Sequence, residues 1–157
     1  MDIYIDGSSM GNPGDAGIGV IFADGETTVK NISRFIGCQT NNVAEYSALI
    51  AGLQEALDMH LKRIRIFSDS QLLCRQINGA YKVKNENIKI LFEQARSLLK
   101  GFESVRVEEI PREKNKGADK LARLAVKKQR SKIGRIAAPK ASKPGEESPS
   151  SSGQRSG

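Results

Sequence analysis

The period of the hydrophobic pattern changes along the chain, and this change restricts the folds that the chain can adopt. In the first third, short apolar segments such as DIYID, GIGVIFA and TTVKNISRFIG are typical of strands joined by hairpins. From Val43 to Met59 the apolar residues recur every three or four positions, which predicts a long helix. The pattern therefore predicts a sheet that begins as a meander and continues through helices.

Strands and helices alternate in the next part of the chain. RIRIFSD and SVRVEEI are predicted strands, whereas residues 70–78, 88–99 and 118–128 are predicted helices, with Asn115 as a cap before the last one. The order βββαβααβα indicates an α/β fold with a five-stranded mixed sheet flanked by helices and right-handed crossovers between its parallel strands. In such sheets functional groups collect at the carboxyl ends of strands.

The composition changes after Gln129. Residues 130–157 are rich in Ser, Gly, Pro and Lys and have no sustained apolar period, so we expect a folded domain over residues 1–129 followed by a basic, disordered tail. The chain has 25 basic and 18 acidic side chains, net +7; six basic minus two acidic residues give the tail +4, which leaves 19 minus 16, or +3, for the domain. This balance favours a polyanionic partner without identifying nucleic acid.

The sequence also indicates a cellular setting. It opens without a basic and apolar leader and contains no apolar run long enough to cross a bilayer, which predicts a cytoplasmic protein with no membrane partner. Cys38 and Cys74 are too few for a disulfide framework or a zinc site, and we expect both to pack as small apolar side chains.

Four acidic residues occupy element ends or core-facing positions. Glu45 extends the apolar stripe of the long helix, Asp6 and Asp69 end predicted strands, and Asp119 lies in the first turn of the last predicted helix. Each alone is more often a cap or a surface residue, but four converging carboxylates would repel one another without a cation. Hard oxygen ligands are those that Mg²⁺ or Mn²⁺ prefers, and two such ions about 3.5 to 4 Å apart can promote phosphodiester hydrolysis.

Four blocks, in order, resemble one enzyme family: DGSSMGNPG, QTNNVAEYSALIAGL, IFSDSQLL and IPREKNKGADKLARLA. The family is ribonuclease H type 1 (ribonuclease HI), and the resemblance spans residues 1–128. It implies a ribonuclease-H-like fold and a two-metal-ion endonuclease that hydrolyses the RNA strand of RNA/DNA hybrids, leaving 3′-hydroxyl and 5′-phosphate ends. DGSSMGNPG lacks the GK[ST] ending of a nucleotide-binding loop, and no small-molecule organic cofactor is expected.

The resemblance assigns roles to individual residues. The catalytic, metal-binding carboxylates are Asp6, Glu45, Asp69 and Asp119, with Asp6 between the two ions. Asn12 and Thr40 match positions that hold a DNA-strand phosphate. Asn41, Asn42 and Gln71 match positions near the minor groove and the RNA sugar, where amides can meet the 2′-hydroxyl. Gly7, Ser8 and Ser70 complete the expected substrate-binding set.

The loop before Asp119 departs from the family pattern. Many members carry a histidine there, whereas this chain has PREKNKGAD, as in histidine-less archaeal-like forms, and Arg112 or Asn115 could substitute. The only histidine, His60, is expected on the surface near the end of the long helix. We expect a monomer that binds an RNA/DNA hybrid. A weakly catalytic or non-catalytic hybrid-binding module, and a nuclease that also cuts double-stranded RNA, are the alternatives.

Overall fold

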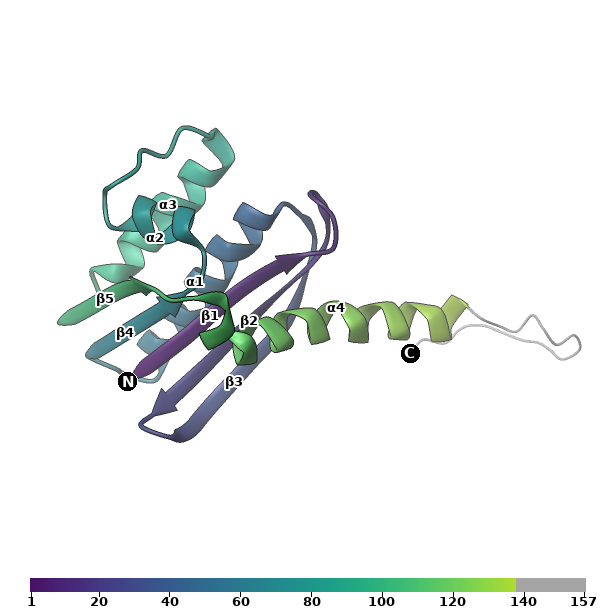
Figure 1. Cartoon of the computed structure of the whole chain (residues 1–157), viewed down its shortest axis with the longest axis horizontal. Coiled ribbons are helices and arrows are strands. Elements are labelled where there is room, and N and C mark those ends of the chain that lie inside the picture. Colours follow the sequence, from purple (N-terminus) through teal and green to yellow (C-terminus); the bar gives the residue numbers. More distant parts are fainter. Residues whose placement is uncertain (138–157) are drawn as a thin grey trace, which may run out of the picture. The chain divides into compact units, whose positions relative to one another are not determined.

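The computed structural model describes residues 1–137 of the 157-residue chain. The observed order confirms the predicted succession of strands and helices (Figure 1). The elements are β1 (Asp2–Ser9), β2 (Gly14–Asp24), β3 (Thr27–Gln39), α1 (Asn41–Asp58), β4 (Arg63–Ser68), α2 (Gln71–Ile77), α3 (Glu86–Leu99), β5 (Ser104–Glu109), a 3-10 helix (Arg112–Lys114) and α4 (Lys116–Ala137).

The five strands form one mixed sheet in the order β3-β2-β1-β4-β5. β1, β2 and β3 pair antiparallel, whereas β4 pairs parallel with both β1 and β5. The pairing of β1 with β4 ends at Tyr4 and Phe67, two residues before Asp6 and Asp69. The two central parallel strands therefore separate just before these acids, which is where α/β sheets place their ligands.

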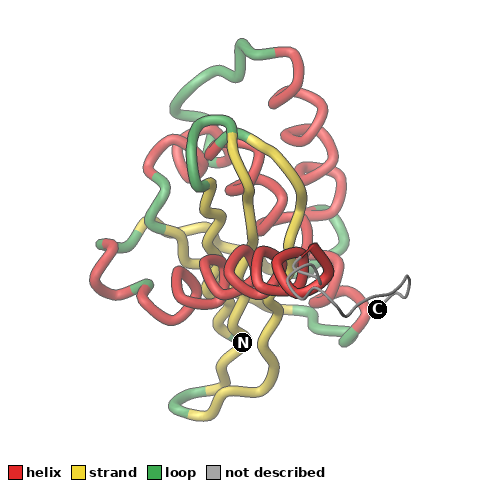
Figure 2. The backbone as a smooth tube through the Cα atoms, turned by 90° about the vertical axis from the view of Figure 1, so that its right-hand side faces the viewer, coloured by secondary structure: helices red, strands yellow, loops and turns green. Residues whose placement is uncertain are grey.

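Helices cover both faces of the sheet. α1 lies on one face, where a Cβ added to Gly52 would lie 3.5 Å from Ile3 and Ile5 of β1. The first part of α4 lies on the other face, where a Cβ added to Gly19 would lie 2.1 Å from the Ala118 carbonyl oxygen. Successive side chains of a strand point to opposite faces, so Asp6 points to the α4 side. The β2–β3 turn and the α2–α3 connection lie at opposite ends of this arrangement (Figure 2).

Three features differ from the prediction. β1 continues to Ser9, because it keeps pairing with β2 after it has left β4, so Asp6 lies inside a strand. α4 continues through residues 130–137 (RSKIGRIA), which were expected to belong to the tail, since Arg, Lys, Ile and Ala are compatible with a helix and can prolong one that has already formed. The rest of the predicted tail, 138–157, lies outside the described residues. Cys38 is exposed on β3 rather than packed, whereas Cys74 is buried.

Among residues 1–137, no helix combines the length and the apolar character needed to span a membrane.

Candidate metal centre and active site

Three of the four predicted acids lie together. One carboxylate oxygen from each of Asp6, Glu45 and Asp69 lies within 4.8 Å of the corresponding oxygens of the other two. They come from β1, from α1 and from the residue that follows β4. Asp119 stands outside this group but lines the same cavity of about 370 Å³, and its carboxylate pairs with Arg123 at 3.1 Å. The fold thus gathers all four acids around one cavity.

Close contact between β1 and α1 holds Glu45 in place. The backbone N–H of Gly7 donates to Glu45 Oε1 at 2.9 Å. A Cβ on Gly7 would lie 2.2 Å from the backbone carbonyl group of Ala44, so only glycine permits this approach. The glycine after Asp6 therefore brings the second carboxylate within reach of the first.

The electrostatics of the cluster indicate excess negative charge. Burial, together with the negative charges of the neighbouring Glu45, Asp69 and Asp119, raises the pKa of Asp6 to about 9. Burial also raises the pKa of Glu45 to about 8, although the Gly7 amide and the positive charge of Arg112 oppose this shift. Converging oxygen ligands that hold protons at neutral pH fit a divalent cation, which would displace those protons.

Asn115 binds Asp69 instead of capping α4. Its Nδ2 donates to Asp69 Oδ2 at 3.1 Å and to the carbonyl oxygen of Ile5 at 2.9 Å. The backbone carbonyl of Asn115 accepts from the N–H of Asp119 at 3.1 Å, so the residue does precede the helix as predicted. The expected side-chain cap of α4 is wrong. The Asn115 amide is instead held by two oxygen acceptors that lie close together at the end of the β1–β4 pairing.

The structure places most of the predicted substrate-binding residues in the cavity of the acids. Its lining includes Gly7, Ser8, Asn41, Ser70 and Gln71.

Three predicted substrate-binding residues, Asn12, Thr40 and Asn42, are not part of this lining. The hydroxyl of Thr40 caps α1 by accepting from the N–H of Val43 at 3.2 Å. Asn12 Oδ1 accepts from the backbone N–H of Asn41 at 3.1 Å, so the loop between β1 and β2 reaches the start of the same helix.

The cavity also shows which loop candidates lie near the acids. Arg112 lines it, whereas His60 lies beyond the end of α1, exposed and with a positive φ of 61°. Arg123 and Leu72 line the cavity too, and sequence reasoning missed both. The available signal for Arg123 was its position four residues after Asp119, one helical turn away on the same face.

Comparison with known proteins identifies the family. A family model described as reverse transcriptase-like matches residues 4–125. The crystal structure of RNase H1 from Halobacterium salinarum matches with a TM-score of 0.79 and 38% identity, over 81% of this chain and 97% of that chain. The chain belongs to the ribonuclease H type 1 family. The ribonuclease-H-like fold predicted from the sequence is thereby confirmed.

Two further proteins are similar to this chain. The structure of LC11-RNase H1 in complex with an RNA/DNA hybrid matches with a TM-score of 0.77 and 39% identity, over 82% of this chain and 97% of that chain. The bifunctional protein Rv2228c of Mycobacterium tuberculosis is 40% identical over 79% of this chain. The chain spans only 35% of that relative's length, and 62% of the length of ribonuclease HI of Halobacterium salinarum.

Proposed function

We propose that this chain is an endonuclease that hydrolyses the RNA strand of RNA/DNA hybrids with two Mg²⁺ or Mn²⁺ ions. A water oxygen bonds to phosphorus and the bond from phosphorus to O3′ breaks, leaving 5′-phosphate and 3′-hydroxyl ends. The observation that carries this proposal is the cluster of Asp6, Glu45 and Asp69, whose oxygens lie within 4.8 Å of one another. Membership of a family with a hybrid-bound structure supports the choice of substrate.

In this proposal the four acids hold the cations. Asp6, on which the charges of Glu45, Asp69 and Asp119 all act, would contribute to holding both ions, as the family resemblance implies. Bound cations would supply activation of the attacking water and stabilisation of the leaving oxygen. The chain's own groups fix the ligands: the Gly7 amide orients Glu45, and Arg123 holds Asp119 at the α4 side of the cavity.

The polar residues around the acids suit a substrate that carries a 2′-hydroxyl. Ser8, Asn41, Ser70 and Gln71 line the cavity and offer both donors and acceptors, which a 2′-hydroxyl can satisfy and a deoxyribose cannot. Asn12 and Thr40 accept hydrogen bonds from backbone N–H groups at the start of α1, where the positive end of the helix favours a DNA-strand phosphate. We assign this activity to residues 1–129 acting as a cytoplasmic monomer, with Asn42 as a further contact to the hybrid.

Strand-resolved cleavage tests the proposal. Labelled RNA/DNA, RNA/RNA and DNA/DNA duplexes are incubated with the wild type and with Asp69→Asn in Mg²⁺ and in Mn²⁺. The wild type should cut the RNA strand of the hybrid, and Asp69→Asn should cut it at least about 100-fold more slowly. Removing a group that only hydrogen-bonds a metal ligand typically lowers activity by up to about 100-fold, and removing the ligand itself should cost at least as much. Asp24→Asn, the same substitution at an exposed residue ending β2, should cleave normally.

Each alternative gives a different result in this assay. Equal cleavage by Asp69→Asn and the wild type would refute the proposed mechanism. Hybrid binding without cleavage in either metal would identify a binding module instead. Cleavage of the RNA/RNA duplex at a comparable rate would extend the substrate to double-stranded RNA.

A further inference from the structure

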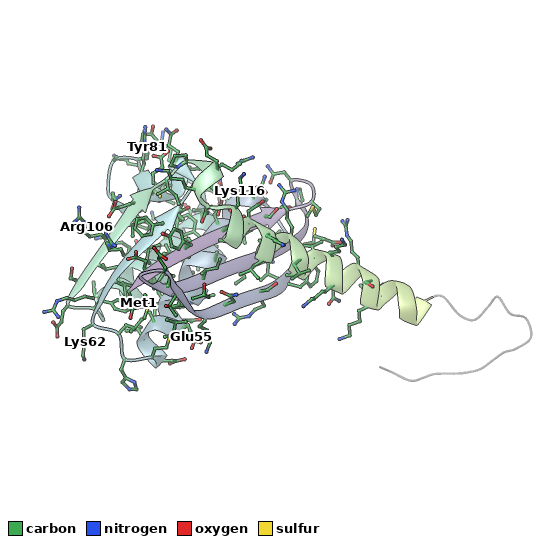
Figure 3. All side chains as sticks on the ribbon, turned by 60° about the horizontal axis from the view of Figure 1, so that its bottom comes forward. Met1, Glu55, Lys62, Tyr81, Arg106 and Lys116 are labelled. Atoms are coloured by element: carbon green, nitrogen blue, oxygen red, sulfur yellow. The ribbon has the colours of Figure 1, made fainter. Side chains whose placement is uncertain are left out.

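One buried amide joins three of the elements that carry the acids. Asn115, only 1% exposed, donates through Nδ2 to the carbonyl oxygen of Ile5, the residue before Asp6. The same Nδ2 donates to Asp69 Oδ2, and the backbone carbonyl accepts from the N–H of Asp119. Lys116, labelled in Figure 3, follows directly and begins α4.

The chemistry of this position requires an amide. Both partners of Nδ2, a carbonyl and a carboxylate oxygen, accept hydrogen bonds only, so the NH₂ group must face them and the reverse orientation would oppose oxygen to oxygen. An aspartate at this position would add a fifth negative charge to the cluster. Asparagine therefore supplies two donors to the acidic site without adding charge.

The same residue is poorly suited to stability alone. Asn115 Oδ1 is buried and has no hydrogen-bond partner among the described residues. A buried acceptor without a partner costs about 1–3 kcal/mol, a cost that an apolar side chain of similar volume would avoid at this atom. Local compromises of this kind are typical of functional sites.

We propose that Asn115 is a positioning residue of the metal centre. Its amide fixes the Asp69 carboxylate against β1 and sets the loop from which α4 presents Asp119. This role rests on the proposed function, because it concerns the cation affinity of the same acids. Groups that hydrogen-bond a metal ligand typically change metal affinity by 10- to 100-fold when they are removed, and we expect a loss of this size here.

The test measures cation affinity in the absence of any duplex. Mn²⁺ is titrated calorimetrically into the full chain as the wild type, Asn115→Ala and Asn115→Leu; leucine keeps the branching at Cγ and so fills the buried space if alanine does not fold. Asn78→Ala is the matched control, because Asn78 Nδ2 also donates to a backbone carbonyl, that of Val107 at 3.0 Å, away from the acids. Thermal unfolding in EDTA is recorded for all four proteins.

The two Asn115 variants should bind Mn²⁺ at least about 10-fold more weakly than the wild type, while Asn78→Ala binds it normally whatever its melting temperature. Hybrid cleavage by the Asn115 variants should accordingly need more metal to reach half of its maximal rate. Wild-type Mn²⁺ affinity in either folded Asn115 variant would overturn the inference and leave the proposed function intact. A wild type that binds Mn²⁺ but cuts no hybrid would refute the proposed function alone, and one that binds no Mn²⁺ would refute both.

Discussion

Replacing Asp6 by asparagine should stabilise the metal-free protein at every pH above about 4. Burial and three neighbouring acids raise the pKa of Asp6 from 3.8 to about 9. The folded state therefore keeps a proton that the unfolded state releases between about pH 4 and pH 9, and stability falls as the pH rises through this window. Asparagine cannot ionise, so this loss disappears in the variant.

The size of the effect follows from the same shift. At pH 7 the solution lies about 3 pKa units above the unfolded-state value, and each unit corresponds to about 1.36 kcal/mol, so the upper bound is about 4 kcal/mol. Asp6 and Glu45 share the repulsion, because the pKa of Glu45 is also raised, to about 8. A shared proton and local relaxation reduce the expected gain to about 2 kcal/mol, or roughly 6 °C in melting temperature.

Thermal unfolding in EDTA from pH 4 to pH 9 measures this effect. The melting temperature of Asp6→Asn should exceed that of the wild type by a margin that grows with pH and vanishes near pH 4, whereas the surface control Asp24→Asn should follow the wild type. Saturating Mn²⁺ should reverse the order, because the wild type gains binding energy that the variant has lost. A variant that is less stable than the wild type at pH 8 without metal, or a pH-independent difference, would refute the reasoning.

Two further substitutions test how the site and its support are packed. Gly7→Ala should destabilise the protein by about 3 kcal/mol in urea denaturation, because its Cβ would lie 2.2 Å from the backbone of α1; a loss below about 0.5 kcal/mol would show that the helix can move away. Tyr46→Phe removes the hydroxyl that donates to Gln76 Oε1 at 2.7 Å and leaves a buried acceptor without that donor, so it should cost about 1–3 kcal/mol in the same assay. An unchanged denaturation midpoint in Tyr46→Phe would mean that water satisfies the amide.

The fold and the acid cluster could be predicted because they depend on features that the sequence displays locally. The spacing of apolar residues along a strand or a helix shows which face of that element is buried, so an acidic residue that falls on the buried face stands out in the sequence. Glu45 was found in this way, by continuing the apolar stripe of α1 backward by one step. The structure bears out that placement, with Glu45 half-buried and held by the Gly7 amide. Such acids are informative because burial without a partner is costly.

The hydrogen bonds of the Asn115 side chain could not be predicted by the same reasoning, because its partners are remote in sequence. A capping rule places an asparagine before a helix correctly, but it does not say what the side chain binds. Here the choice is decided by Ile5 and Asp69, 110 and 46 residues away, whose oxygens lie where the β1–β4 pairing ends. Two hydrogen bonds to these acceptors displace the local cap, so tertiary structure overrides the local preference. An asparagine that shortly precedes an active-site aspartate can therefore donate to the carboxylates of the site instead of capping the helix.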